Sequence, residues 1–196
     1  MIGRLERQLG FIREIDGLKQ VLRQTYLMDA SRQENDAEHS WHISLMAMVL
    51  AEYADEPVDV LKVIGMLLVH DLVEIDAGDT FLYSDERARE AHRAAELQAA
   101  ERIFGLLPAD QARRFRDLWE EFEAKASPEA RFAAALDRLQ PLLHNHATAG
   151  LAWRKHGVRR EQVVAMNAGI ANGSRQLWNY ASALIDEAVA RGYLAG

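Results

Sequence analysis

The chain has 196 residues, of which 49% are hydrophobic and 27% charged, so it is long enough for one domain with a sizeable core. Asp and Glu outnumber Lys and Arg by 30 to 23, and the net charge of −7 argues against a surface that binds duplex nucleic acid. Because the chain contains no Cys, disulfides, thiolate nucleophiles and iron–sulfur clusters are excluded, and any metal is expected on His and carboxylate side chains.

Apolar residues recur at helical spacing along nearly the whole chain, and strand-like alternation is missing, which predicts an all-α fold. The N-terminus, residues 1–7, is charged and lacks the apolar core of a signal peptide. A first helix is expected from about Gly3 into the low twenties, with an apolar stripe from Leu5 to Leu22 and with Arg23 near its end.

The polar stretch 29–36 separates this helix from the next. It ends in Asn35-x-x-Glu38, a spacing typical of a helix cap, because the two side chains can satisfy free backbone N–H groups. A second helix is therefore expected at about Ala37–Tyr53.

The third predicted helix is the most apolar part of the chain. Pro57 is expected to open it, since the first turn needs no proline N–H, and from Val58 to Val69 few residues are polar. Such a helix is typical of the buried centre of a bundle. Its longest apolar run, Val63–Val69, is too short to span a bilayer, so we expect a soluble cytoplasmic protein with no membrane partner. The helix ends in His70-Asp71, two polar residues that need partners in a core.

The second half of the chain continues the helical pattern. Residues 74–80 predict a loop or irregular turn, and a polar bend is expected around Lys155-His156-Gly157. The last segment, about Arg160–Arg191, contains Gly169 and Gly173, which argue against one uninterrupted helix. The helices expected between these points are at about Asp85–Phe104, Pro108–Glu123 and Pro128–His146.

The dipeptide His70-Asp71 has two interpretations. A helix C-terminus commonly ends in residues of this type, because His stabilises the helix dipole and Asp begins a turn. An ion beside the same terminus could instead accept a ring nitrogen and a carboxylate oxygen together.

The surrounding sequence favours the ion. His39 follows the capping signal, Glu74 lies four residues after His70, and Asp79 follows a glycine. Asp137 interrupts an apolar helical run, where an unpaired carboxylate would be costly. Two imidazoles and two carboxylates suit a catalytic divalent ion that keeps positions open for water. The central prediction is that distant side chains converge around one cation.

These residues resemble a known family, the HD superfamily of metal-dependent phosphohydrolases, and most closely its small 5′-deoxynucleotidases. The likeness is strongest over about residues 15–145, and we expect residues 1–196 to form a single HD domain on which the segment 160–191 packs. The motifs that carry the likeness are Glu38-His39-Ser40, Val69 to Glu74 with Gly78-Asp79, Ala135-Leu136-Asp137, and Leu107-Pro108 with Leu118 to Phe122.

The resemblance implies a role for each matched residue. Glu74 would orient or deprotonate the attacking water, and Asp79 would contact the sugar or leaving oxygen or help to hold a second ion. Arg23 would bind phosphate, although Gln24 and Thr25 stand where close relatives often carry a Trp. The implied metal ligands are His39, His70, Asp71 and Asp137.

The implied reaction is hydrolysis of (deoxy)nucleoside 5′-monophosphates to nucleoside and phosphate by a metal-activated water. The ion could be Mn, Co, Mg, Zn, Ni or Fe, because His and carboxylate sites accept several. The expected partners are a small nucleotide substrate and a second copy of the chain. Two alternatives stay open, an HD phosphodiesterase that acts on cyclic or hyperphosphorylated nucleotides and a non-catalytic HD-fold binding module. An HD di-iron oxygenase is disfavoured, because it needs more His ligands than His92 between Asp71 and Asp137.

The remaining candidates have simpler interpretations. His42 shares a helix face with His39 and is expected to support it or to pack, with a role as a ligand as the alternative. His144 and His146 are expected to act at a helix end, with an extension of the site as the alternative. His92 and His156 lie among charged residues, which predicts solvated side chains. The residues expected in the core are Trp41, Met46 and Met48.

Overall fold

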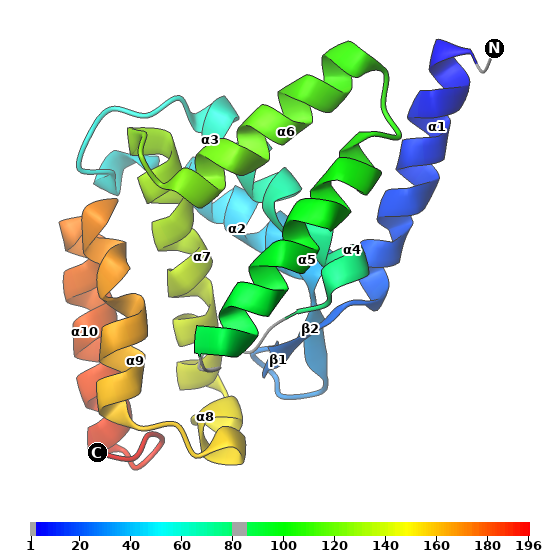
Figure 1. Cartoon of the computed structure of the whole chain (residues 1–196). Coiled ribbons are helices and arrows are strands. Elements are labelled where there is room, and N and C mark those ends of the chain that lie inside the picture. The colour runs from blue at the N-terminus through cyan, green and yellow to red at the C-terminus, as the bar shows by residue number, and fades with distance from the viewer. Residues whose placement is uncertain (1–2, 80–85) are drawn as a thin grey trace.

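The computed structural model describes residues 3–79 and 86–196, and the helical prediction is confirmed over these ranges, apart from a two-stranded sheet (Figure 1). Thr80 and Asp85, which the sequence assigned to a loop and a helix start, lie outside the described residues. The helices are α1 Arg4–Glu14, α2 Asp36–Leu50, α3 Val60–Val69, α4 Glu74–Ala77, α5 Glu86–Phe104, α6 Ala109–Ala124, α7 Pro128–Ala147, α8 Leu151–His156, α9 Arg160–Asn167 and α10 Arg175–Ala190.

Helix α7 lies in the middle of the molecule, packed against α2, α3, α6 and α10 (Figure 1). Its buried apolar residues join those of α2, α3 and α10 in one core cluster. A second cluster joins α1, α5 and α6 to the 3₁₀ segment His70–Val73. Since α3 belongs to the first cluster through Met66 and reaches the second at Val69, its end delivers His70-Asp71 to the junction of the two cores.

Helix α3 is central, as predicted, but it begins later than expected. Asp59, rather than Pro57, precedes its first turn, because the Asp59 carboxylate accepts hydrogen bonds from the N–H groups of Leu61 and Lys62. The helix is also not buried on every side, since the Leu61 side chain is 80% exposed.

The first helix is shorter than predicted, and Arg23 lies on a strand. Helix α1 ends at Glu14, a 3₁₀ segment follows, and strand β1, Leu22–Tyr26, pairs antiparallel with β2, Gln33–Asn35. Hydrogen bonds across the turn, including Gln33 Nε2 to the Arg23 carbonyl at 2.8 Å, hold the hairpin. The apolar residues from Leu5 to Leu22 recur at helical spacing, so the sequence predicts a helix up to the point where β1 begins. Thr25 and Tyr26 nevertheless have high strand propensity.

The C-terminal segment is interrupted, as its glycines indicated. A 3₁₀ segment, Ala168–Asn172, separates α9 from α10, and Gly173 lies against α7 so closely that a Cβ would be 2.4 Å from the Arg131 carbonyl oxygen. The predicted polar bend at 155–157 is instead the end of α8, which Gly157 terminates with a φ of 63°. Among the described helices, none combines the length and apolarity that a membrane crossing requires.

Candidate metal centre

The four predicted metal ligands come from three separate parts of the fold. His39 lies in the first turns of α2, where the reciprocal hydrogen bonds of Asn35 and Glu38 fix the helix start, as predicted. His70 and Asp71 begin the 3₁₀ segment after α3, and Asp137 lies in the middle of α7. We call these residues the candidate metal cluster: His39, His70, Asp71 and Asp137.

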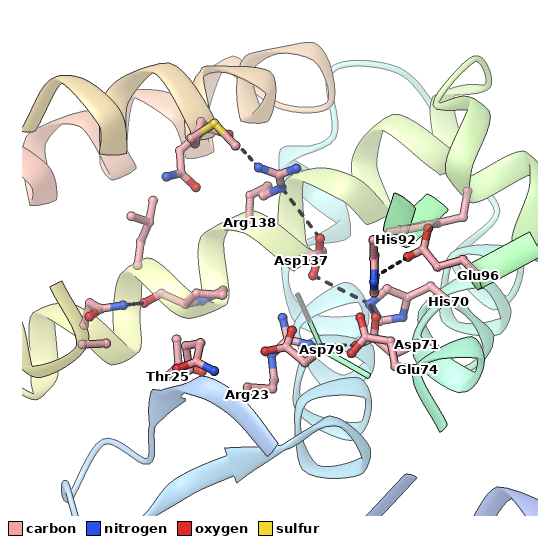
Figure 2. Close-up of a pocket in the computed structure, with 18 of the residues that line it drawn as sticks. Arg23, Thr25, His70, Asp71, Glu74, Asp79, His92, Glu96, Asp137 and Arg138 are labelled. Carbon is pink, nitrogen blue, oxygen red and sulfur yellow. Dashed lines mark hydrogen bonds and ion pairs between the residues drawn. The ribbon is translucent and has the colours of Figure 1, made fainter. Parts of the chain in front are cut away.

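Their polar atoms converge. His39 Nε2 lies 3.1 Å from Asp137 Oδ1 and 4.0 Å from Asp71 Oδ2. His70 Nε2 lies 3.1 Å from Asp71 Oδ1 and 3.7 Å from Asp137 Oδ1. The structure therefore brings together side chains that are separated by up to 98 residues in the sequence, and Figure 2 shows three of them, His70, Asp71 and Asp137, around one space.

Both imidazole rings are held through the nitrogen that faces away from Asp137. His70 Nδ1–H donates to the Leu67 carbonyl at 2.9 Å, and His39 Nδ1 lies 3.2 Å from the side-chain oxygen of Gln140. His70 Nε2 is buried and has no hydrogen-bond partner among the described residues. Because metal-binding histidines commonly donate the other ring N–H to such an acceptor, these rings fit a divalent ion.

The electrostatics of the two rings differ. Burial lowers the pKa of His39 to about 4, so its ring is neutral near pH 7. Burial acts the same way on His70, but the charges of Asp71 and Asp137 outweigh it and raise the pKa of His70 to about 9. Burial would raise the pKa of Asp137, but the charge of His70 outweighs it and holds that pKa well below its usual range. In the metal-free protein a proton on His70 thus balances part of the negative charge that a cation would balance.

Glu74 and Asp79 lie in a second acidic group with Asp36, which we call the carboxylate trio: Asp36, Glu74 and Asp79. One oxygen from each lies within 4.8 Å of the others, close enough to hold a cation. Burial, together with the charges of Asp71, Asp36 and Asp79, raises the pKa of Glu74 well above its usual range. Burial likewise raises the pKa of Asp79 to about 6.

Arg23 links the trio to the candidate metal cluster. Its Nη1 donates to Asp36 Oδ1 and to Asp71 Oδ2, both at 2.9 Å. Strand β1 therefore puts the predicted phosphate-binding side chain beside one of the predicted metal ligands, although the sequence had expected it on a helix.

A cavity of about 390 Å³ opens onto both groups, which suits a ligand of drug or nucleotide size. Arg23, His70, Asp71, Glu74, Asp79 and Asp137 all line it. The prediction that His92 is solvated is wrong, because its side chain is 15% exposed, lines this cavity and lies 3.1 Å from Glu96 on the same helix (Figure 2). Arg138 is a further cavity cation, and its Nη1 donates to the Met166 carbonyl at 2.8 Å.

The other histidines are distributed differently. His42 and His144 form a third group with Glu34, which we call the Glu34 cluster: Glu34, His42 and His144. His144 lies in the last turn of α7, at the helix end as expected, and its ring is buried against the hairpin, where Nδ1–H donates to the Tyr26 carbonyl. His146, in the last turn of α7, lies 3.5 Å from Glu187 of α10, and His156 is exposed, as expected.

Sequence reasoning missed several polar residues of the site. Asp36 was treated only as part of a polar stretch, although an acid before a His-containing helix was a visible signal. Glu34 and Gln140 have no such signal, because each contacts the other from a distant segment, and His92 has none because the cavity that it lines is built from distant segments. Two residues expected in the core, Trp41 and Met48, are exposed, whereas Met46 is buried.

Two solved structures are similar to this chain. A crystal structure of a protein from Magnetospirillum magnetotacticum, described as a predicted metal-dependent phosphohydrolase, is 56% identical and covers 98% of this chain and 99% of its own, with a TM-score of 0.92. A Listeria innocua protein described as an HD-domain phosphohydrolase is 17% identical. The match covers 90% of this chain and 98% of the Listeria protein, and the two share the fold with a TM-score of 0.59.

Two curated proteins are also similar in sequence to this chain. The human 5′-deoxynucleotidase HDDC2 is 32% identical over 136 residues, which is 69% of this chain and 65% of the human protein, so the match spans less than two thirds of that relative. The cattle protein of the same name is also 32% identical, over 73% of this chain and 69% of its own. The family model for the HD domain matches residues 15–178, further along the chain than the motifs alone had indicated. The chain belongs to the HD domain family.

Proposed function

We propose that this protein is a metal-dependent phosphomonoesterase that hydrolyses (deoxy)nucleoside 5′-monophosphates to nucleoside and phosphate. The observation that carries the proposal is the convergence of His39, His70, Asp71 and Asp137 beside the cavity. The relatives named 5′-deoxynucleotidase support the substrate class.

The candidate metal cluster supplies two nitrogens and two carboxylates, which suit a borderline divalent ion. When bound, such an ion lowers the pKa of a water ligand and draws charge from a phosphoryl oxygen. His39 and His70 hold their Nε2 atoms toward the carboxylates of the cluster, because their Nδ1 atoms are anchored elsewhere. Asp71 and Asp137 supply the negative charge that retains a cation.

The cavity cations bind and orient the anionic substrate. Arg23 lies beside Asp71, and its planar guanidinium suits two phosphate oxygens better than a lysine would. Arg138 adds a positive charge next to Asp137. These charges are needed because the cavity is also lined by several acids, which would repel a nucleotide monophosphate on their own.

Glu74 lies at the edge of the cavity, where it can exchange a proton with water or substrate. Its raised pKa favours the protonated carboxyl group, and its Oε2 is buried with no hydrogen-bond partner among the described residues. A carboxyl group of this kind can take a proton from water or give one to a leaving oxygen, once charges nearby adjust its pKa toward neutrality. Asp79, on the same wall, contacts the sugar or leaving oxygen in this proposal.

Phosphate release from a nucleotide panel tests the proposal. Metal-stripped protein is restored with Mn²⁺, Co²⁺, Mg²⁺ or Zn²⁺ and incubated with nucleoside monophosphates, cyclic nucleotides and hyperphosphorylated nucleotides. We expect phosphate from 2′-deoxynucleoside monophosphates and none from the Asp71→Ala variant. Opening of cyclic nucleotides alone would favour a phosphodiesterase, and no reaction with any metal would favour a binding module.

We also propose that the protein is a homodimer that pairs through α2. Trp41, Leu45, Met48 and Val49 share one face of this helix, and Trp41, Met48 and Val49 are each more than 60% exposed. An apolar face of this kind on a helix whose opposite face is buried is typical of a protein interface. Sedimentation analysis should give a dimer for the wild type and a monomer for Met48→Glu. A monomeric wild type would contradict the proposal.

Two further predictions of the sequence are kept as proposals. Residues 1–196 form a single HD domain, which is supported by the apolar cluster that joins α2 to α10. The cytoplasmic location stays a prediction.

A further inference from the structure

Gln140 occupies an unusual position between two groups of His and carboxylate side chains. It lies on α7, three residues after Asp137, and its side chain is fully buried. Its oxygen lies 3.2 Å from His39 Nδ1. Its nitrogen lies 2.6 Å from Glu34 Oε1, 3.0 Å from His144 Nε2 and 3.4 Å from His42 Nδ1.

The partners of Gln140 fix which way its amide points. Burial raises the pKa of Glu34 to about 7, and its ionised form can only accept, which is consistent with the NH₂ group of Gln140 facing Glu34. His144 agrees with this orientation, because its Nδ1–H donates to the Tyr26 carbonyl at 2.9 Å and leaves Nε2 as an acceptor. The Gln140 oxygen must therefore face His39.

This orientation determines the tautomer of His39. The Gln140 oxygen can only accept, so the single N–H of the neutral His39 ring lies on Nδ1. The lone pair of Nε2 then faces Asp137 Oδ1, which lies 3.1 Å away. Two electron-pair donors that face each other at this distance are arranged as ligands of one cation.

The Glu34 cluster has the composition of a metal site, but its centre is filled. The Gln140 nitrogen lies within 3.4 Å of all three members, so the amide takes the place that an ion would need. Its two N–H groups serve Glu34 and His144, the two nearest acceptors. The Glu34 cluster therefore surrounds and holds the amide group of Gln140. Glu34 comes from β2, and Tyr26 of β1 holds His144 through its carbonyl group.

We propose that Gln140 is a positioning residue that holds His39 with Nε2 directed at the metal, and that Glu34 and His144 hold Gln140 in turn. The inference rests on the proposed function in one respect, namely that His39 binds the ion. It assigns the Glu34 cluster to the support of that ligand.

Mn²⁺ binding to metal-free protein tests this inference through affinity rather than turnover. Loss of a residue that orients a metal ligand typically weakens metal binding by about 10–100-fold. We expect a loss of this size for Gln140→Leu, measured at a temperature where the variant is folded. Leu139→Ala, which truncates the neighbouring buried residue of α7, should leave Mn²⁺ affinity within about twofold, because Leu139 packs only in the apolar core.

A double substitution separates positioning from mere packing. Glu34→Gln with Gln140→Glu exchanges the amide and the carboxylate, so an acceptor for His39 Nδ1–H and the buried charge are both retained. We expect this variant to bind Mn²⁺ more tightly than Gln140→Leu. Wild-type affinity in Gln140→Leu, or equal loss in Leu139→Ala, would overturn the inference.

The His39 tautomer distinguishes failure of this inference from failure of the proposed function. Long-range ¹H–¹⁵N spectra of metal-free protein near pH 7 should show His39 as the Nδ1–H tautomer, and Gln140→Leu should lose that preference. Wild type that binds no Mn²⁺ but keeps this signal would contradict the proposed function, while the orientation of His39 by Gln140 would still hold. An Nε2–H tautomer in the wild type would overturn that role.

Discussion

The candidate metal cluster and the Glu34 cluster have similar side chains but different centres. Each cluster contains two imidazoles and at least one buried carboxylate. Gln140 contacts His39 in the first cluster and Glu34 in the second. In the Glu34 cluster the acceptors surround an amide N–H group, so their hydrogen-bonding needs are met by the protein. In the candidate metal cluster the Nε2 of His70 is buried with no such donor among the described residues.

From this difference we infer that composition and spacing alone do not decide which group would bind an ion. The deciding feature in this proposal is whether a donor from the protein already lies among the acceptors. Buried acceptors without a donor are costly, and a cation or a proton relieves that cost. The raised pKa of His70 is a consequence of the same arrangement, because Asp71 and Asp137 attract the proton.

Removal of Asp137 should have the largest effect on metal binding by the candidate metal cluster. Asp137 Oδ1 lies close to both imidazoles, 3.1 Å from His39 Nε2 and 3.7 Å from His70 Nε2. Asp137→Ala is expected to bind no divalent ion and to lose phosphatase activity by more than about 10³-fold, because the activated water is lost. Metal analysis and phosphate release check this, and a variant that retains one ion per chain would contradict the assignment.

Removal of Arg23 should separate substrate binding from metal binding. Arg23→Ala is expected to raise KM for nucleoside monophosphates by about 10–100-fold, the loss typical of one charge-assisted interaction. Mn²⁺ content should stay normal, since Arg23 repels cations. Arg23→Lys is the matched control and should recover part of the loss, because it keeps the charge without the planar fork. Lost metal in Arg23→Ala would contradict its role.

Substitutions within the Glu34 cluster should have the smallest effects. His144→Ala removes an acceptor 3.0 Å from the Gln140 nitrogen, and a loss of up to about 10-fold in Mn²⁺ affinity is expected. His42→Ala removes a contact at 3.4 Å and should change the affinity by less than about twofold. If His42→Ala lowered the metal content by one ion per chain, the Glu34 cluster would be a metal site after all.

The sequence predicted the helices and the convergent residues well, for a physical reason. Capping signals and apolar periodicity are local, so they indicate where α2 begins and where α3 delivers His70. A carboxylate inside an apolar run, such as Asp137, indicates a buried partner even when that partner is unknown.

Features that depend on distant contacts could not be predicted in this way. Strand β1 forms because it pairs with β2. The helical spacing of the apolar residues before it gives no sign that the helix ends and a strand follows. Trp41 and Met48 were assigned to the core because apolar residues usually lie there, but α2 is apolar on its exposed face as well. Gln140 carries no signal in sequence, since its role follows from neighbours on two other elements, α2 and β2.

Anomalous diffraction from crystals grown with Mn²⁺ tests the central claim most directly. The account predicts a peak among His39 Nε2, His70 Nε2 and the carboxylates of Asp71 and Asp137, with no peak among Glu34, His42 and His144. A peak in the Glu34 cluster, or none beside Asp137, would contradict it.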